Sequence, residues 1–174
     1  MVNVRLPSRP RVLHDSPVMS VNEIEILPDP EQHELLVATL ERVNRVSNAA
    51  RAAALSRPGS GGAELRDIVS DEIEKAKLPG GFHAPIVDRV QAALDRRSKK
   101  FSQYQSVILP ASAFKWSSDG RVALPTAKGR RTIRVRIDMT RGGLRPPLEG
   151  RPTMLVYRNG EFALWAADVD RSED

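Results

Sequence analysis

The stretch from Arg121 to Asp138 reads RVALPTAKGRRTIRVRID, and its second half decides the fold. Two sets of residues alternate there, Ile133, Val135 and Ile137 on one side and Thr132, Arg134 and Arg136 on the other. Successive side chains of a β-strand point to opposite faces. The alternation therefore predicts a strand with an apolar inner face and a basic outer face.

The residues before this strand add further positive charge. Lys128, Arg130 and Arg131 surround Gly129, at which the backbone can turn tightly. A strand with such an outer face indicates an anionic partner, for which nucleic acid is the leading candidate. The alternative is an ordinary solvated face, which is common for a charged strand.

The basic residues are unevenly distributed along the 174 residues, although the net charge is only +5. From Tyr104 to Pro152 there are ten Lys/Arg and three Asp/Glu, whereas Val18 to Leu36 holds five acids and no base. The chain after Pro152 holds five acids and two arginines. A basic middle between acidic segments concentrates positive potential on one part of the fold, as a protein that holds a polyanion requires.

The composition limits the other classes of function. The chain has no cysteine, which excludes disulfides and thiolate zinc sites and fits a cytoplasmic protein. No apolar run approaches the length of a membrane span, and the N-terminus lacks the apolar region of a secretory signal. The three histidines have no companion at a spacing typical of metal ligands, and no catalytic constellation appears. We expect no catalytic residue, no metal and no cofactor.

The periodicity predicts helices in the first part of the chain and strands in the second. A short strand is expected at 21–26, after a flexible arm at 1–17 that contains three prolines. Asp29 and Pro30 are typical of a helix start and predict a helix that runs to about residue 55. Two more helices are expected at about 63–77 and 84–101, separated by glycine-rich breaks.

The third predicted helix carries a second group of cations. At 100° per residue Arg89, Arg96 and Lys100 form a narrow stripe beside the apolar face, and Arg97 and Lys99 extend it. The alternative is a solvated helix flank.

The end of the chain holds the strongest local signal. Two strand-like runs, TMLVYR and EFALWAAD, are separated by Asn159-Gly160, which predicts a β-hairpin with a two-residue turn. A single strand at 21–26 would leave its backbone unpaired, so it should pair with the strands after residue 102. The fold class predicted is α+β, with three helices inserted into one antiparallel sheet or barrel.

This order of elements resembles the N-terminal half of the transposon-encoded TnpB (OrfB) proteins and of the type V CRISPR RNA-guided nucleases. The resemblance rests on LERVNRVSNAARAA, LPGGFHAPIVDRVQAALDRRSKKF, FKW followed by GRVALPTAKGRRTIRVRI, and the terminal hairpin GRPTMLVYRNGEFALWAAD. It covers residues 18–168, and the order of the segments is more specific than any one of them.

The resemblance implies a domain organisation. Residues 18–28 and 102–168 would form a wedge-like, oligonucleotide-binding-like (OB-like) β-barrel, and residues 29–101 a helical recognition insertion. Residues 169–174 would be an acidic tail. The RuvC nuclease half of that family would follow the hairpin, and only Asp168 and Asp170 stand where it would begin. The sequence would thus be a fragment, a natural truncation or one half of a split effector.

The resulting hypothesis is a non-catalytic nucleic-acid-binding module whose partners are guide RNA and target DNA, with a separate nuclease chain as a further partner and no membrane. The residues expected to bind nucleic acid are Arg89, Arg96, Arg97, Lys100, Trp116, Lys128, Arg130, Arg134 and Arg136. We expect the strand and helix cations to form one surface. The alternative is an assembly subunit whose basic strand binds an acidic protein; a metal-dependent nuclease is disfavoured, because no carboxylate or histidine cluster supports it.

Overall fold

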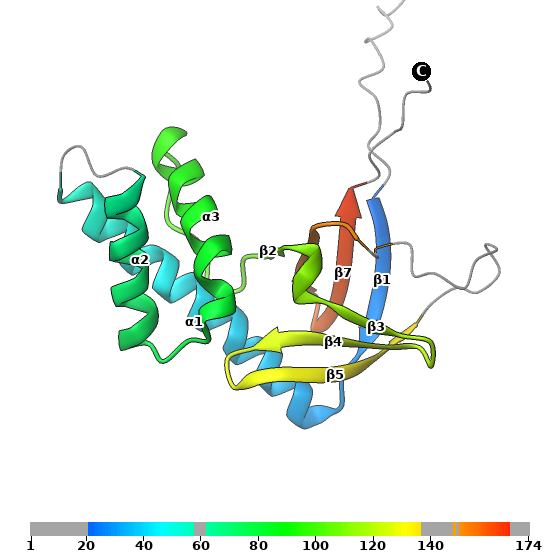
Figure 1. The fold of residues 1–174 in the computed structure, drawn as a ribbon. Helices are drawn as coiled ribbons and strands as arrows, with labels where there is room; N and C mark the ends of the chain where they lie inside the picture. Colours follow the sequence, from blue (N-terminus) through cyan, green and yellow to red (C-terminus); the bar gives the residue numbers. More distant parts are fainter. Residues whose placement is uncertain (1–20, 58–61, 137–147, 149, 168–174) are drawn as a thin grey trace, which may run out of the picture.

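The computed structural model describes residues 21–57, 62–136, 148 and 150–167. The predicted arm, the loop at 141–147 and the acidic tail lie outside these residues. Three helices gather at one end of the molecule, and a curved sheet forms the other end (Figure 1).

Within the described ranges the sheet is antiparallel and has seven strands in the order β2-β6-β7-β1-β5-β4-β3. The strands are β1 (Val21–Leu27), β2 (Val107–Leu109), β3 (Lys115–Ser117), β4 (Arg121–Thr126), β5 (Gly129–Arg136), β6 (Thr153–Arg158) and β7 (Glu161–Ala167). The first strand lies between β7 and β5, so it pairs on both sides with strands that follow the helices. The predicted insertion of the helices into one sheet is confirmed.

The sheet is strongly curved but open. Strands β2 and β3 form its two edges, yet only residues 110–114 connect them along the chain. Such a connection spans at most about 21 Å, whereas a flat sheet of seven strands would be roughly 29 Å wide. The two edges must therefore curl towards each other.

The prediction of a closed barrel is wrong. No ladder joins β2 to β3, and both edge strands are only three residues long. The connection between them forms a 3₁₀ turn, η2 (Ala111–Ala113). The carbonyl of Ala113 accepts a hydrogen bond from the Arg130 side chain at 2.6 Å instead of one from a neighbouring strand.

The helices are α1 (Pro30–Leu55), α2 (Ala63–Lys75) and α3 (His83–Asp95), with a short turn η1 (Gly80–Phe82) before α3. The predicted start of α1 is confirmed by a capping box. The Gln32 amide donates to Asp29 Oδ1 at 2.8 Å, and the Asp29 amide donates to Gln32 Oε1 at 3.2 Å. These two bonds satisfy amides that the first turn of a helix leaves free.

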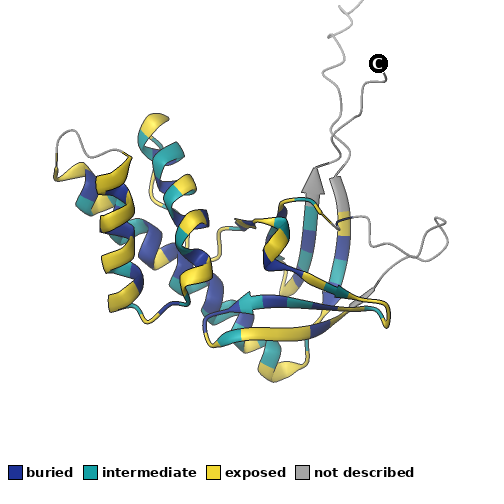
Figure 2. Ribbon diagram, viewed as in Figure 1, coloured by how far each residue is buried: buried dark blue, intermediate teal, exposed yellow. Residues whose placement is uncertain are grey.

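Helix α1 belongs to both ends of the molecule and joins them into one core. Its first half packs on the sheet, where the Thr39 hydroxyl accepts a bond from the Ala127 amide at 2.8 Å and the His33 ring lies against Phe162. Its second half packs against α2 and α3. Buried positions run along the whole helix (Figure 2), and they form one cluster with the buried face of the sheet.

Helix α3 is shorter than predicted, because it ends at Asp95 rather than near Phe101. Arg97 adopts a positive φ of 49°, and the amides of Arg97 and Ser98 donate to the carbonyls of Leu94 and Ala93. This pattern is a Schellman motif, which usually has glycine where Arg97 stands. Because position 97 is not a glycine, no helix-stop signal was visible in the sequence. The apolar periodicity alone therefore predicted a helix about six residues longer than the one observed.

The terminal hairpin forms as predicted. Asn159 and Gly160 have φ values of 53° and 87°, and the register pairs Arg158 with Glu161 and Leu155 with Leu164. Positive φ at both central residues is the mark of a type I′ turn.

Candidate nucleic-acid interface

A cleft of about 820 Å³ lies between α3 and the sheet edge formed by β2 and β6. One of its walls is cationic and includes Arg89, Arg96, Lys99 and Lys100. The opposite wall is apolar and includes Ile108, Pro110, Pro152 and Met154. Of the nine residues predicted from the sequence to bind nucleic acid, four belong to α3 or the segment after it. Three of these four line the cleft, namely Arg89, Arg96 and Lys100.

The positive charge of the cleft is not compensated within the described part of the chain. None of its four cations forms an ion pair there, because the two salt bridges are Lys75–Glu72 and Arg121–Asp119. Among the described residues that line the cleft, Asp88 is the single acid. Arg97, the fourth predicted residue of this region, is exposed and does not line the cleft.

Arg89 is the most unusual of these cations. Its guanidinium lies over the ring of Phe101, with Cζ 4.2 Å from the ring centroid. The Nη1 atom is buried and has no hydrogen-bond partner. Burial lowers the pKa of Arg89 to about 10, so the group remains charged at neutral pH. Partial burial of a charge without a counter-ion is costly, which makes Arg89 a position where a bound anion would be stabilised.

The segment that carries Lys99, Lys100 and Phe101 is held by polar side chains of α1. Asn48 bonds the backbone of Phe101 twice, with Nδ2 donating to the carbonyl at 2.9 Å and Oδ1 accepting from the amide at 2.9 Å. Asn44 Nδ2 donates to the carbonyls of Gln103 and Gln105. These side chains fix one wall of the cleft.

The sequence analysis missed this role of α1. Asn44, Asn48 and Arg51 follow one another at helical spacing, and Arg51 donates to the carbonyl of Ser98. A polar stripe on a helix that is otherwise buried indicates that it satisfies the backbone of another segment. That signal was present in LERVNRVSNAARAA.

The basic outer face of β5 is less available to an anionic ligand than the sequence predicted. Arg130 Nη1 donates to the carbonyls of Ala113 and Ala123, so this guanidinium ties the sheet edge to its neighbours. Lys128 and Arg134 are exposed and form no ion pair with a described residue. The backbone of Arg136 belongs to β5, but its side chain lies outside the described part of the structure.

The neighbouring strands also place acids beside these arginines. Position 136 lies directly opposite Glu25 of β1 in the register, and Glu23 is two residues further along β1. Position 134 is opposite Leu27 on one side and Arg121 on the other, and Arg121 pairs with Asp119 at 3.0 Å. Charges opposite each other on one face of a sheet interact directly. The outer face around β5 is therefore of mixed charge.

Trp116, the predicted stacking residue, is half-buried. It lies opposite Val122, a core residue, and its ring stacks on Phe114 with centroids 6.5 Å apart. Most of its surface is thus used in packing, which leaves little of the ring for a base.

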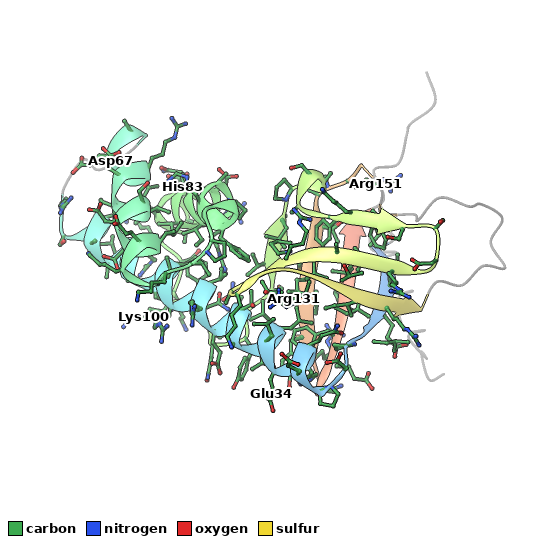
Figure 3. All side chains as sticks on the ribbon, turned by 60° about the horizontal axis from the view of Figure 1, so that its bottom comes forward. Glu34, Asp67, His83, Lys100, Arg131 and Arg151 are labelled. Atoms are coloured by element: carbon green, nitrogen blue, oxygen red, sulfur yellow. The ribbon has the colours of Figure 1, made fainter. Side chains whose placement is uncertain are left out.

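The two predicted groups of cations do not share this cleft. The residues that line the cleft come from α3, the segment after it, β2 and β6, and none belongs to β5. Figure 3 shows Lys100 beside the helices and Arg131 beside the β4–β5 hairpin.

No protein-family model matches the chain, and no curated protein matches it either. Among the described residues, no group of three or more His, Cys, Asp or Glu could hold a metal ion. Within the same ranges, no helix combines the length and the apolar character that crossing a membrane requires.

Proposed function

We propose that the protein is a nucleic-acid-binding module that holds its ligand in the cleft between α3 and β2. The observation that carries the proposal is the half-buried guanidinium of Arg89, whose Nη1 atom is buried without a hydrogen-bond partner and which stands beside three further cations. Arginine and lysine side chains without acidic partners suit phosphates, which supply the missing charge and accept several hydrogen bonds.

In this proposal the curved sheet acts as an OB-like wedge, and the three helices act as a recognition insertion. Support comes from the order of the elements, with one strand before the helices and six after them, and from the curvature of the sheet. Guide RNA and target DNA in the cytoplasm are the proposed ligands, and a separate nuclease chain is a further proposed partner. The relationship to the TnpB and type V proteins is part of the proposal.

A second candidate is an assembly subunit that binds an acidic protein. It is favoured by Ile108, which is 59% exposed on the short edge strand β2 and lies across the cleft from the cationic wall. An exposed apolar residue that faces a cationic wall could receive an acidic helix or strand as well as a nucleic acid.

Salt dependence separates the two candidates. A single-stranded RNA that contacts all four cations should bind with a slope of log affinity against log salt of about −3, because bound counter-ions are released. The measurement is fluorescence anisotropy of a labelled RNA of about 20 nucleotides over a salt series, with a polyglutamate peptide as the competing ligand. Absence of RNA binding at low salt, or tighter binding of the peptide than of the RNA, would overturn the proposal.

A further inference from the structure

The two walls of the cleft differ in chemistry, and this difference indicates what kind of nucleic acid fits. The α3 side carries the four cations, Arg89, Arg96, Lys99 and Lys100, together with apolar residues such as Phe101, whereas the sheet side offers carbon surface at Ile108, Pro110, Pro152 and Met154. A nucleotide has the same two parts, an anionic phosphate and a flat, largely apolar base. A cleft of about 820 Å³ also lies within the range of sites that enclose a single small molecule.

Arg89 has the properties of a fixed phosphate anchor. Its stacking on Phe101 restricts the plane of the guanidinium, and Phe101 is itself held by two hydrogen bonds from Asn48. A guanidinium that is already oriented loses less conformational freedom when it binds an anion. Arg96 is exposed and shares the same wall, so it can contact a neighbouring phosphate.

The apolar wall can contribute to binding only if it contacts a base that is neither paired nor stacked in a duplex. In a duplex each base is paired and stacked on its neighbours, so the protein meets mainly phosphates and sugars. In a loop, a bulge or a single strand, the face of a base can lie against protein side chains instead. Ile108 is exposed on the open edge of the sheet, where no strand of the described residues covers it.

We propose that this cleft binds one unpaired nucleotide of a nucleic-acid strand, with the base against Ile108 and Met154 and the phosphate against Arg89 and Arg96. The proposal rests on the proposed function, because it requires that the cleft bind nucleic acid at all. It adds that the protein distinguishes unpaired from paired nucleotides, and that apolar contact at β2 provides the distinction.

The test compares three labelled RNAs of equal charge density: a perfect duplex, the same duplex with a one-nucleotide bulge, and that bulge made abasic. The protein should bind the bulged RNA about tenfold more tightly than the duplex, and the abasic bulge should lose most of this gain. Ile108→Ser should lower the affinity for the bulged RNA about fivefold and leave the duplex unchanged.

Leu27→Ser is the matched control, because Leu27 is also an exposed strand residue, at 40%, and lies on β1 away from the cleft residues. It should leave all three affinities unchanged. Equal binding of duplex and bulge, with a steep salt dependence, would overturn the nucleotide site and leave the proposed function standing. No binding of any of the RNAs would overturn both. Equal losses from Ile108→Ser and Leu27→Ser would also contradict the assignment to the cleft.

Discussion

The cleft beside α3 and the outer face of β5 are both basic in sequence, but their surroundings differ. In the cleft, four cations have one acid, Asp88, among the described lining residues, and the half-buried Arg89 has a buried Nη1 atom without a hydrogen-bond partner. On β5, Arg130 bonds backbone carbonyls, and the neighbouring strand β1 carries Glu23 and Glu25. A run of basic residues in a sequence therefore does not define a basic surface, because the neighbours across the fold decide how much of the charge is free.

The largest effect is expected from the inner face of β5. Ile133 is 1% exposed, so Ile133→Ala should lower the free energy of unfolding by about 2 to 4 kcal/mol, through lost contacts and the cavity left behind. Its neighbour Arg134 is exposed on the opposite face, and Arg134→Ala should change the free energy of unfolding by less than about 0.5 kcal/mol. Denaturant unfolding of both variants measures the difference. A similar loss for both would mean that the outer face of β5 is also packed.

Arg89→Met should separate stability from binding. Without the phosphate anchor, the affinity for single-stranded RNA should fall about 30-fold, or roughly 2 kcal/mol. The free energy of unfolding at pH 7 should rise by about 1 kcal/mol, because a partly buried charge without a counter-ion is replaced by an apolar side chain of similar length. A variant that is less stable and binds RNA normally would show that Arg89 serves packing on Phe101.

The pH dependence of this gain in stability has a definite sign. The folded protein binds the Arg89 proton less tightly than the unfolded chain does, because burial lowers its pKa to about 10. Below pH 10 the charge of Arg89 therefore destabilises the wild type in full, and the free energy of unfolding of the wild type increases as the pH rises through 10. The difference between the wild type and Arg89→Met should shrink over that range, as unfolding curves between pH 8 and pH 11 would show. A constant difference would mean that the variant stabilises the protein in another way.

A smaller effect is expected where α1 holds the cleft wall. Asn48→Ala removes both hydrogen bonds to Phe101 and should lower the free energy of unfolding by about 1 to 2 kcal/mol. Because Phe101 supports Arg89, the RNA affinity should fall as well. Gln103→Ala is a suitable control, since Gln103 is exposed and its side chain bonds only Glu41. If Asn48→Ala left the RNA affinity at the wild-type value, the wall would not depend on α1.

Much of the fold could be predicted from the sequence, because its signals are local. Asp29-Pro30 marked the start of α1, Asn159-Gly160 set the register of β6 and β7, and the alternation around Ile133 identified β5. The end of α3 could not be predicted, since Arg97 adopts a left-handed conformation that glycine normally takes. The open sheet edge was missed too, because closure depends on contacts between β2 and β3 that no local pattern reports.

The site was predictable in part. The sequence indicated Arg89, Arg96 and Lys100, although it placed Lys100 on the helix rather than on the segment after it. It could not reveal the apolar wall, since Ile108 and Met154 come together only through the pairing of β2 with β6. Nor could it show that glutamates of β1, about a hundred residues earlier in the chain, stand beside the arginine strand.

The most direct test of the account compares two matched charge reversals. Arg96→Glu with Lys100→Glu alters the cleft, and Lys128→Glu with Arg134→Glu alters the β4–β5 hairpin; all four side chains are exposed, and both pairs change the net charge equally. RNA affinity over a salt series should fall about 100-fold for the cleft pair, with a shallower salt slope, and less than about threefold for the hairpin pair. A greater loss for the hairpin pair, or equal losses for both, would contradict the assignment of nucleic-acid binding to the cleft.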